Sequence, residues 1–119
     1  WRRALELGCD RLVVVLTRER GYRKQPDHAG AVMERAFRKY PAFLHTLSDR
    51  AERYNRCREE LFALEKAGKA LVIAPKSTQG FSRMERDTRK ILALWQDGYF
   101  AGRDAAGAVR QLWTSDSSV

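Results

Sequence analysis

Apolar residues gather into two short runs, one near the start of the chain and one after residue 69. Residues 11–18 read Arg-Leu-Val-Val-Val-Leu-Thr-Arg, and such a run of β-branched types is typical of a strand buried on both faces. Residues 70–74, Ala-Leu-Val-Ile-Ala, form the second run. Two strands cannot supply all the neighbours that a doubly buried strand requires, so the pattern indicates part of a larger α/β protein.

The spacing of apolar residues elsewhere predicts helices. Intervals of three and four residues predict a long helix over residues 42–67, ended by Gly68. Shorter helices are predicted over residues 2–7 and 29–39. The order of strand, helices and strand then implies a right-handed parallel crossover.

The last third of the chain is predicted to hold two helices. Ser82-Arg-Met-Glu85 matches a capping box, so a helix is expected to begin there and to end at Gly98. A final helix should run from about Tyr99 to Trp113, followed by a polar tail.

Composition gives broad limits. The chain has 119 residues, and 44% hydrophobic with 32% charged residues is ordinary for a globular domain. The first apolar run is too short for a membrane span and does not match a signal peptide. The chain opens at Trp1 without a methionine, and we do not expect this to be a natural N-terminus. Cys9 and Cys57 lack metal-site spacing, so we interpret both as buried thiols in a reducing compartment.

The net charge of +8 is unevenly distributed. The densest basic segment, residues 18–24, follows the first strand, at the edge where open α/β sheets place ligands. Four side chains there are candidate contacts for lipid head groups or other anions; they are Arg18, Arg20, Arg23 and Lys24. The alternative is a solvated basic loop. A second basic group, Arg83, Arg86, Arg89 and Lys90, opens the helix after the second strand.

Several segments together resemble bacterial patatin-like phospholipases. Residues 2–18 followed by Gly21-Tyr-Arg-Lys24 are similar to the family segment just downstream of its catalytic aspartate. The likeness continues through four further motifs and covers most of the chain; they are Glu52-Arg-Tyr-Asn55, Ala70-Leu-Val-Ile-Ala-Pro75, Ser82-Arg-Met-Glu-Arg-Asp87 and Gly98-Tyr99. It is closest to a subfamily with a C-terminal extension of unassigned role.

This resemblance implies a fold and a division of the chain. The fold class is α/β, a fragment of a three-layer sandwich with two parallel strands, about five helices and a helix-rich C-terminal extension. Residues 1–27 would end the patatin-like core, and residues 28–119 would form the mostly helical extension with one strand near residues 70–74. The family hydrolyses lipid acyl esters with a Ser-Asp dyad, whose G-x-S-x-G and D-G-G or D-G-A motifs would lie upstream of Trp1.

This chain contains neither dyad motif, so we assign no catalytic residue and expect the chain alone to be inactive. Ser82 has Gly80 two residues before it but lacks the second glycine of a nucleophile turn, and a helix cap explains it better. Asp10 is not followed by Gly-Gly or Gly-Ala. His28 and His45 form no catalytic constellation. We expect no metal and no cofactor.

Three functions remain open. The first is the C-terminal part of a patatin-like lipid acyl hydrolase that gives structural or lipid-surface support, with the upstream core and an anionic lipid surface as partners. The second is a protein-interaction or scaffold domain, whose isolated chain self-associates. The third, a basic nucleic-acid-binding module, is disfavoured because the charge is split and no recognition motif is present. We expect a cytoplasmic protein, peripheral to a membrane in the first case.

Overall fold

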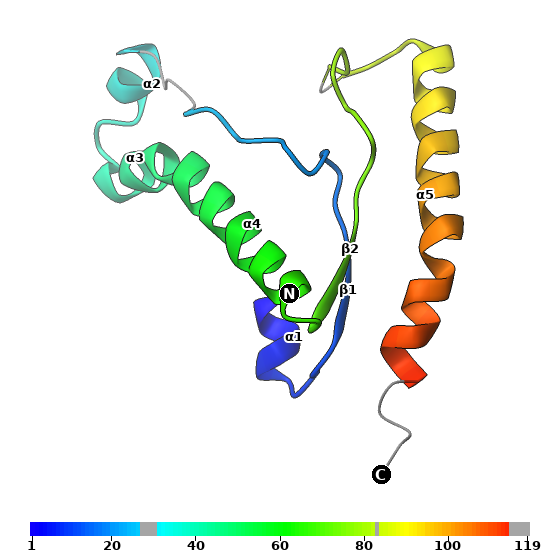
Figure 1. Cartoon of the computed structure of the whole chain (residues 1–119). Coiled ribbons are helices and arrows are strands. Elements are labelled where there is room, and N and C mark those ends of the chain that lie inside the picture. The colour runs from blue at the N-terminus through cyan, green and yellow to red at the C-terminus, as the bar shows by residue number, and fades with distance from the viewer. Residues whose placement is uncertain (27–30, 83, 115–119) are drawn as a thin grey trace. The chain divides into compact units, whose positions relative to one another are not determined.

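The computed structural model describes residues 1–26, 31–82 and 84–114 (Figure 1). His28 and Arg83, named above, lie outside the described residues. The elements, in chain order, are α1 (Arg2–Glu6), β1 (Leu12–Val15), α2 (Ala31–Ala36), α3 (Pro41–Ser48), α4 (Arg50–Lys66), β2 (Ala70–Ile73) and α5 (Thr88–Thr114). The mixed α/β class expected from the sequence is confirmed at this level.

The chain divides into two compact units. One comprises residues 1–22 and 62–119, and the other comprises residues 23–61. The first unit holds α1, both strands, the last turn of α4 and α5. The second holds α2, α3 and most of α4. The family boundary expected near residue 27 is not tested by this division, which follows compactness alone.

The two strands pair in parallel, as predicted. Leu12 is paired with Ala70 and Val15 with Ile73. Each strand follows a helix that ends in the same way. Gly8 and Gly68 have φ values of +90° and +72°, which glycine adopts at little cost, and each closes its helix by donating its N–H to a carbonyl three residues earlier. The predicted helix stops at these two glycines are confirmed.

Burial is uneven across the sheet. Leu12, Ala70 and Val72 are buried on one face, because alternate residues of a strand share a face. On the other face Val15 is 70% exposed. β1 is therefore not buried on both faces by the described residues, although its composition is typical of such a strand.

One long helix, α5, replaces the two helices predicted for the end of the chain. It passes through Gly98 without a break and runs beside β2 (Figure 1). The guanidinium of Arg11, just before β1, donates to the carbonyl of Leu112 near the end of α5. Since α5 begins near the carboxyl ends of the strands and finishes near their start, it runs antiparallel to them.

The start of α5 also differs from the prediction. Ser82 does not cap a helix, because neither Ser82 nor residues 84–87 are helical. The Glu85 carboxylate instead accepts the N–H groups of Arg86 at 3.0 Å and Asp87 at 3.1 Å, and this holds a turn before the helix. Asp87 then caps α5 with its side-chain oxygen, 3.0 Å from the N–H of Arg89.

The helices of the second unit also differ from the predicted ones. The helix predicted over residues 42–67 is divided between α3 and α4 at Asp49, which keeps helical backbone angles. Pro41 occupies the first turn of α3, as its sequence position suggested. The rings of Phe37 and Phe43 lie 5.0 Å apart and join the end of α2 to α3. Of the helix predicted over residues 29–39, the described part α2 covers Ala31–Ala36, and residues 37–39 form a turn.

The two cysteines are free thiols, and one of them corrects an expectation. Cys9 is exposed, because it follows Gly8 in the surface turn that leads into β1. Cys57 is only partly buried, within α4. The interpretation of Cys9 as a buried thiol is wrong.

Candidate functional site

The carboxyl ends of β1 and β2 meet at one edge of the sheet, because the strands are parallel. The loops that leave this edge are joined by polar side chains. Arg18 donates to the hydroxyl of Thr78 at 2.9 Å. The Glu19 carboxylate accepts the Thr78 N–H at 2.9 Å and also accepts the Thr78 hydroxyl proton. Thr78 is 5% exposed, so one buried side chain holds both loops in place.

The hydrogen bond from the Thr78 hydroxyl lowers the pKa of Glu19, and the backbone amides and the charge of Arg18 act in the same direction. The carboxylate is therefore ionised at neutral pH and acts as an acceptor only. A hydroxyl that donates to a carboxylate is also the arrangement that a nucleophile needs. Thr78 does not suit that role, because it is buried and its oxygen already accepts from Arg18.

A second polar group lies along the side of β2. Arg20 donates to both carboxylate oxygens of Glu65, at 2.6 and 2.7 Å, and also to the carbonyl of Val72 at 2.7 Å. Glu65 accepts the N–H of Val72 at 3.0 Å. The bond from Arg20 lowers the pKa of Glu65 and raises that of Arg20. The Arg20–Glu65 pair thus bonds both backbone groups of Val72.

The four predicted anion contacts are divided between the two units. Arg18 and Arg20 belong to the first, with the partners given above. Arg23 and Lys24 belong to the second, where Arg23 pairs with Glu59 at 2.8 Å. The backbone of Lys24 is bonded by the side chain of Asn55, at 2.8 and 3.0 Å. An anion at any of the three arginines competes with these partners, and the predicted role stays a prediction.

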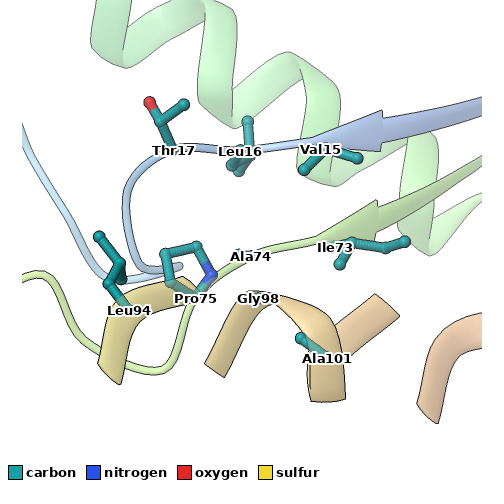
Figure 2. A pocket seen from close by; sticks show the side chains of 9 residues that line it. All are labelled: Val15, Leu16, Thr17, Ile73, Ala74, Pro75, Leu94, Gly98 and Ala101. Atoms are coloured by element: carbon teal, nitrogen blue, oxygen red, sulfur yellow. The ribbon is translucent and has the colours of Figure 1, made fainter. Parts of the chain in front are cut away.

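Two hollows lie at the same edge of the sheet within the first unit, and the sequence analysis did not find them. Figure 2 shows the first, a mostly apolar cavity of about 220 Å³ between the strand ends and α5. Its strand side includes Val15, Ile73 and Pro75, and its helix side includes Gly98 and Ala101, whose small size leaves the space open. The only sign of this cavity in the sequence was a pair of small residues, a glycine and an alanine, three positions apart in an apolar helix.

The second hollow is more polar. It has a volume of about 390 Å³ and shares Thr17 and Leu94 with the first. Arg18, Thr78 and Glu85 also line it, so a cation, a hydroxyl and a carboxylate face this space. Backbone N–H groups that donate to Glu85 lower its pKa, and the N–H of Asp87 has the largest effect. Apolar and polar hollows side by side suit an amphiphilic molecule better than a highly charged one.

Two features are absent from the described residues. No group of three or more His, Cys, Asp or Glu side chains that could hold a metal ion occurs among them. In the part of the chain that the structure describes, no helix combines the length and apolarity needed to cross a membrane.

Comparison with known proteins identifies one family. Residues 40–113 match the model of a family described as a domain of unknown function (DUF6363), and the chain belongs to this family. The match begins just before α3 and ends one residue before the end of α5. No curated protein and no solved structure matches the chain.

Proposed function

We propose that this chain is the C-terminal part of a patatin-like lipid acyl hydrolase, in which it supplies sheet strands and lipid-surface support but no catalytic residue. The sequence motifs that resemble the family support this proposal. The structural observation that supports the proposal is the contrast between the two edges of the β1–β2 pair.

The outer edge of β2 is closed by side chains. In the parallel ladder, Leu12 donates to the carbonyl of Lys69, which places the backbone groups of Val72 on the edge away from β1. A third strand would bond Val72 at this position. Its N–H and carbonyl are already bonded by Glu65 and Arg20. Blocking an edge with charged side chains is a common protection against further strand pairing.

The outer edge of β1 has the opposite character. The same ladder directs the backbone N–H and carbonyl groups of Val13 and Val15 away from β2. The described residues form a two-stranded sheet, and Val15 is largely exposed beside this edge. A strand rich in valine whose edge faces no other strand among the described residues is suited to a further parallel strand. We therefore place the rest of the hydrolase sheet next to β1, with β2 as the last strand.

The chemistry would come from the upstream part. In the described residues, Thr78 is buried, and Ser82 lies well beyond the end of β2, in the segment before α5, with its N–H 3.5 Å from Glu85. Neither matches the exposed turn that presents a nucleophile at the end of a strand. The Ser-Asp dyad implied by the resemblance fits a position outside this chain.

The first test is hydrolysis of a short-chain chromogenic ester and of a phospholipid by this chain and by a longer protein that includes the upstream polypeptide. We expect activity in the longer protein alone, and its loss when the serine of the upstream G-x-S-x-G motif is changed to alanine. Hydrolysis by the 119-residue chain, or an inactive longer protein, would contradict the proposal.

The second test addresses the edge. In the 119-residue chain, amide exchange should be slow at Val14, whose N–H bonds β2, and faster at Val13. In the longer protein, Val13 should also become protected. If Val13 is already protected in this chain and the chain sediments as a dimer, the edge pairs with a second copy, and the scaffold function replaces the hydrolase proposal.

A further inference from the structure

The apolar cavity between the strand ends and α5 exists because the helix presents small residues there. Gly98 and Ala101 line its helix side, and Ile73 and Pro75 line its strand side (Figure 2). A Cβ added at Gly98 would meet no heavy atom within 4 Å outside its own stretch of helix, so there is room beside this glycine. Protein interiors seldom leave space larger than a water molecule, and an apolar cavity accepts apolar molecules. The cavity is therefore suited to a hydrocarbon group.

The volume of the cavity sets the size of that group. The cavity measures about 220 Å³. An apolar cavity of about 150 Å³ inside another protein holds one benzene molecule. On that scale, the present cavity holds a hydrocarbon chain of about eight carbon atoms. Pro75 in its wall has no N–H group, so the wall presents no backbone donor at that position.

The cavity lies beside the polar hollow. Thr17 and Leu94 line both, so a chain in the cavity has its polar end next to the hollow. Two side chains of opposite charge, Arg18 and Glu85, line the hollow there. Backbone N–H groups lower the pKa of Glu85, so its carboxylate is ionised at neutral pH. A head group in the hollow therefore meets one positive and one negative group.

Both charged groups have partners within the fold. The Arg18 guanidinium donates to the Thr78 hydroxyl and lies over the ring of Tyr22, 5.0 Å from its centroid. The Glu85 carboxylate accepts backbone N–H groups and lies 3.7 Å from the ammonium group of Lys90. A charged head group would compete with these partners. A hydroxyl both donates and accepts, so it can bond groups that keep their partners.

We propose that the two hollows together bind one amphiphile with a single hydrocarbon chain of about eight carbons and an uncharged head group that carries hydroxyls. The chain lies in the apolar cavity, and the hydroxyls lie in the hollow lined by Arg18 and Glu85. Ligand sites commonly combine an apolar pocket with a few polar groups that orient the ligand. This site goes beyond the hydrolase function proposed above and does not depend on it.

Titration with 1-O-alkylglycerols tests the site, because these ethers have two hydroxyls, no charge and no ester bond. Calorimetry below the concentration of micelle formation gives Kd for the 119-residue chain. Each CH₂ group that becomes buried should lower Kd about fourfold, so octylglycerol should bind at least about tenfold more tightly than hexylglycerol. Decylglycerol should gain little more, because the cavity is full. A Kd that falls equally at both steps, or at neither, would overturn the assignment.

Two variants of α5 fill the cavity. Gly98→Leu and Ala101→Leu each place a larger side chain in its wall, and each should weaken binding of octylglycerol by about tenfold or more. Gly107→Leu is the matched control, since it makes the same change at an exposed position about 180° around the helix from Gly98. It should bind as the original chain does, and circular dichroism checks that all three keep their helices. Equal Kd values for the cavity variants and the control would overturn the site.

Octyl sulfate, which has the same chain and a negative charge, tests the head group. It should bind about fivefold more weakly than octylglycerol, because the sulfate loses hydration and Glu85 repels it. Glu85→Gln keeps an oxygen that accepts the backbone N–H groups and removes the charge. It should strengthen binding of octyl sulfate and leave that of octylglycerol unchanged. Octyl sulfate that binds the original chain as tightly as octylglycerol would contradict the uncharged head group.

The competing occupant of the cavity is a side chain of the upstream polypeptide. If the 119-residue chain binds octylglycerol and the longer protein does not, that polypeptide fills the cavity and the ligand site is wrong. Ester hydrolysis by the longer protein is a separate measurement. Its failure, with octylglycerol binding intact, removes the hydrolase proposal and leaves this site.

Discussion

The bonds between Arg20, Glu65 and Val72 give the sharpest prediction about stability. Changing Glu65 to alanine removes the acceptor of the Val72 N–H, which lies on a strand residue that is 4% exposed. An unpaired buried N–H costs about 1 to 3 kcal/mol. The loss of the ion pair with the half-exposed Arg20 adds at most about 1 kcal/mol. We expect Glu65→Ala to lower the free energy of unfolding by about 2 to 3 kcal/mol.

Two further variants separate these contributions. Glu65→Gln keeps an oxygen that accepts the Val72 N–H but loses the charge, so it should cost about 1 kcal/mol. Glu59→Ala removes an ion pair of similar geometry, with Arg23, at an exposed position that bonds no strand residue. It should cost less than about 1 kcal/mol. Urea unfolding followed by circular dichroism measures all three. Equal effects of Glu65→Ala and Glu59→Ala would refute the reasoning that the edge bonds matter more than the charge pair.

Acid should reveal the same interaction. The folded chain holds the pKa of Glu65 below its ordinary value of 4.5, mainly through the bond from Arg20. A carboxyl group with a lowered folded pKa stabilises the fold above its unfolded pKa, and this stability is lost as the pH falls through the folded value. The stability difference between the original chain and Glu65→Gln should therefore be constant near neutral pH and should shrink below about pH 4.5. A difference that grows on acidification would contradict this assignment.

Two shorter predictions concern helix ends. Asp87→Ala should cost about 1 kcal/mol in urea unfolding because Asp87 caps α5, whereas Ser82→Ala should cost less; the reverse order would restore the capping box predicted from the sequence. Gly68→Ala should destabilise by about 1 kcal/mol, since a Cβ is strained at a φ of +72°, while Gly98→Ala, inside α5, should be neutral or stabilising by up to about 1 kcal/mol. A larger loss at Gly98 than at Gly68 would show that α5 is not continuous.

The strands and the glycine stops at Gly8 and Gly68 were predictable because their signals are local, whereas the stop predicted at Gly98 is wrong. A run of valines and a glycine after a helical pattern act through the backbone of a few adjacent residues, and β1, β2, Gly8 and Gly68 all lie close to where the sequence placed them. The start of α5 was missed because two local signals compete. Ser82 and Glu85 have capping-box spacing, and one Glu85 oxygen does accept the Ser82 N–H at 3.5 Å. The other oxygen accepts the N–H groups of Arg86 and Asp87, and this forms a turn before the helix.

The candidate site depends on pairs that are distant in the sequence. Glu65 lies 45 residues after Arg20, and Glu59 lies 36 residues after Arg23. Their separation in the sequence does not reveal that they pair. A count of charges therefore suggests that residues 18–24 form a basic loop without carboxylate partners. In the structure, Arg20 and Arg23 have carboxylate partners, and Arg18 donates to the buried Thr78. The local excess of positive charge is real, but part of it serves the fold.

The different treatment of the two sheet edges explains how a chain with so small a sheet can carry a strand as apolar as β1. If side chains closed both edges, the valine-rich β1 could not pair with a further strand. Among the described residues, side chains close the β2 edge, with Glu65 from the last turn of α4 and Arg20 from the loop after β1. Both residues lie within the unit that contains the strands. The chain can therefore end a sheet on one side by itself while its other side stays available to a neighbouring strand, and the exchange of Val13 measures that availability directly.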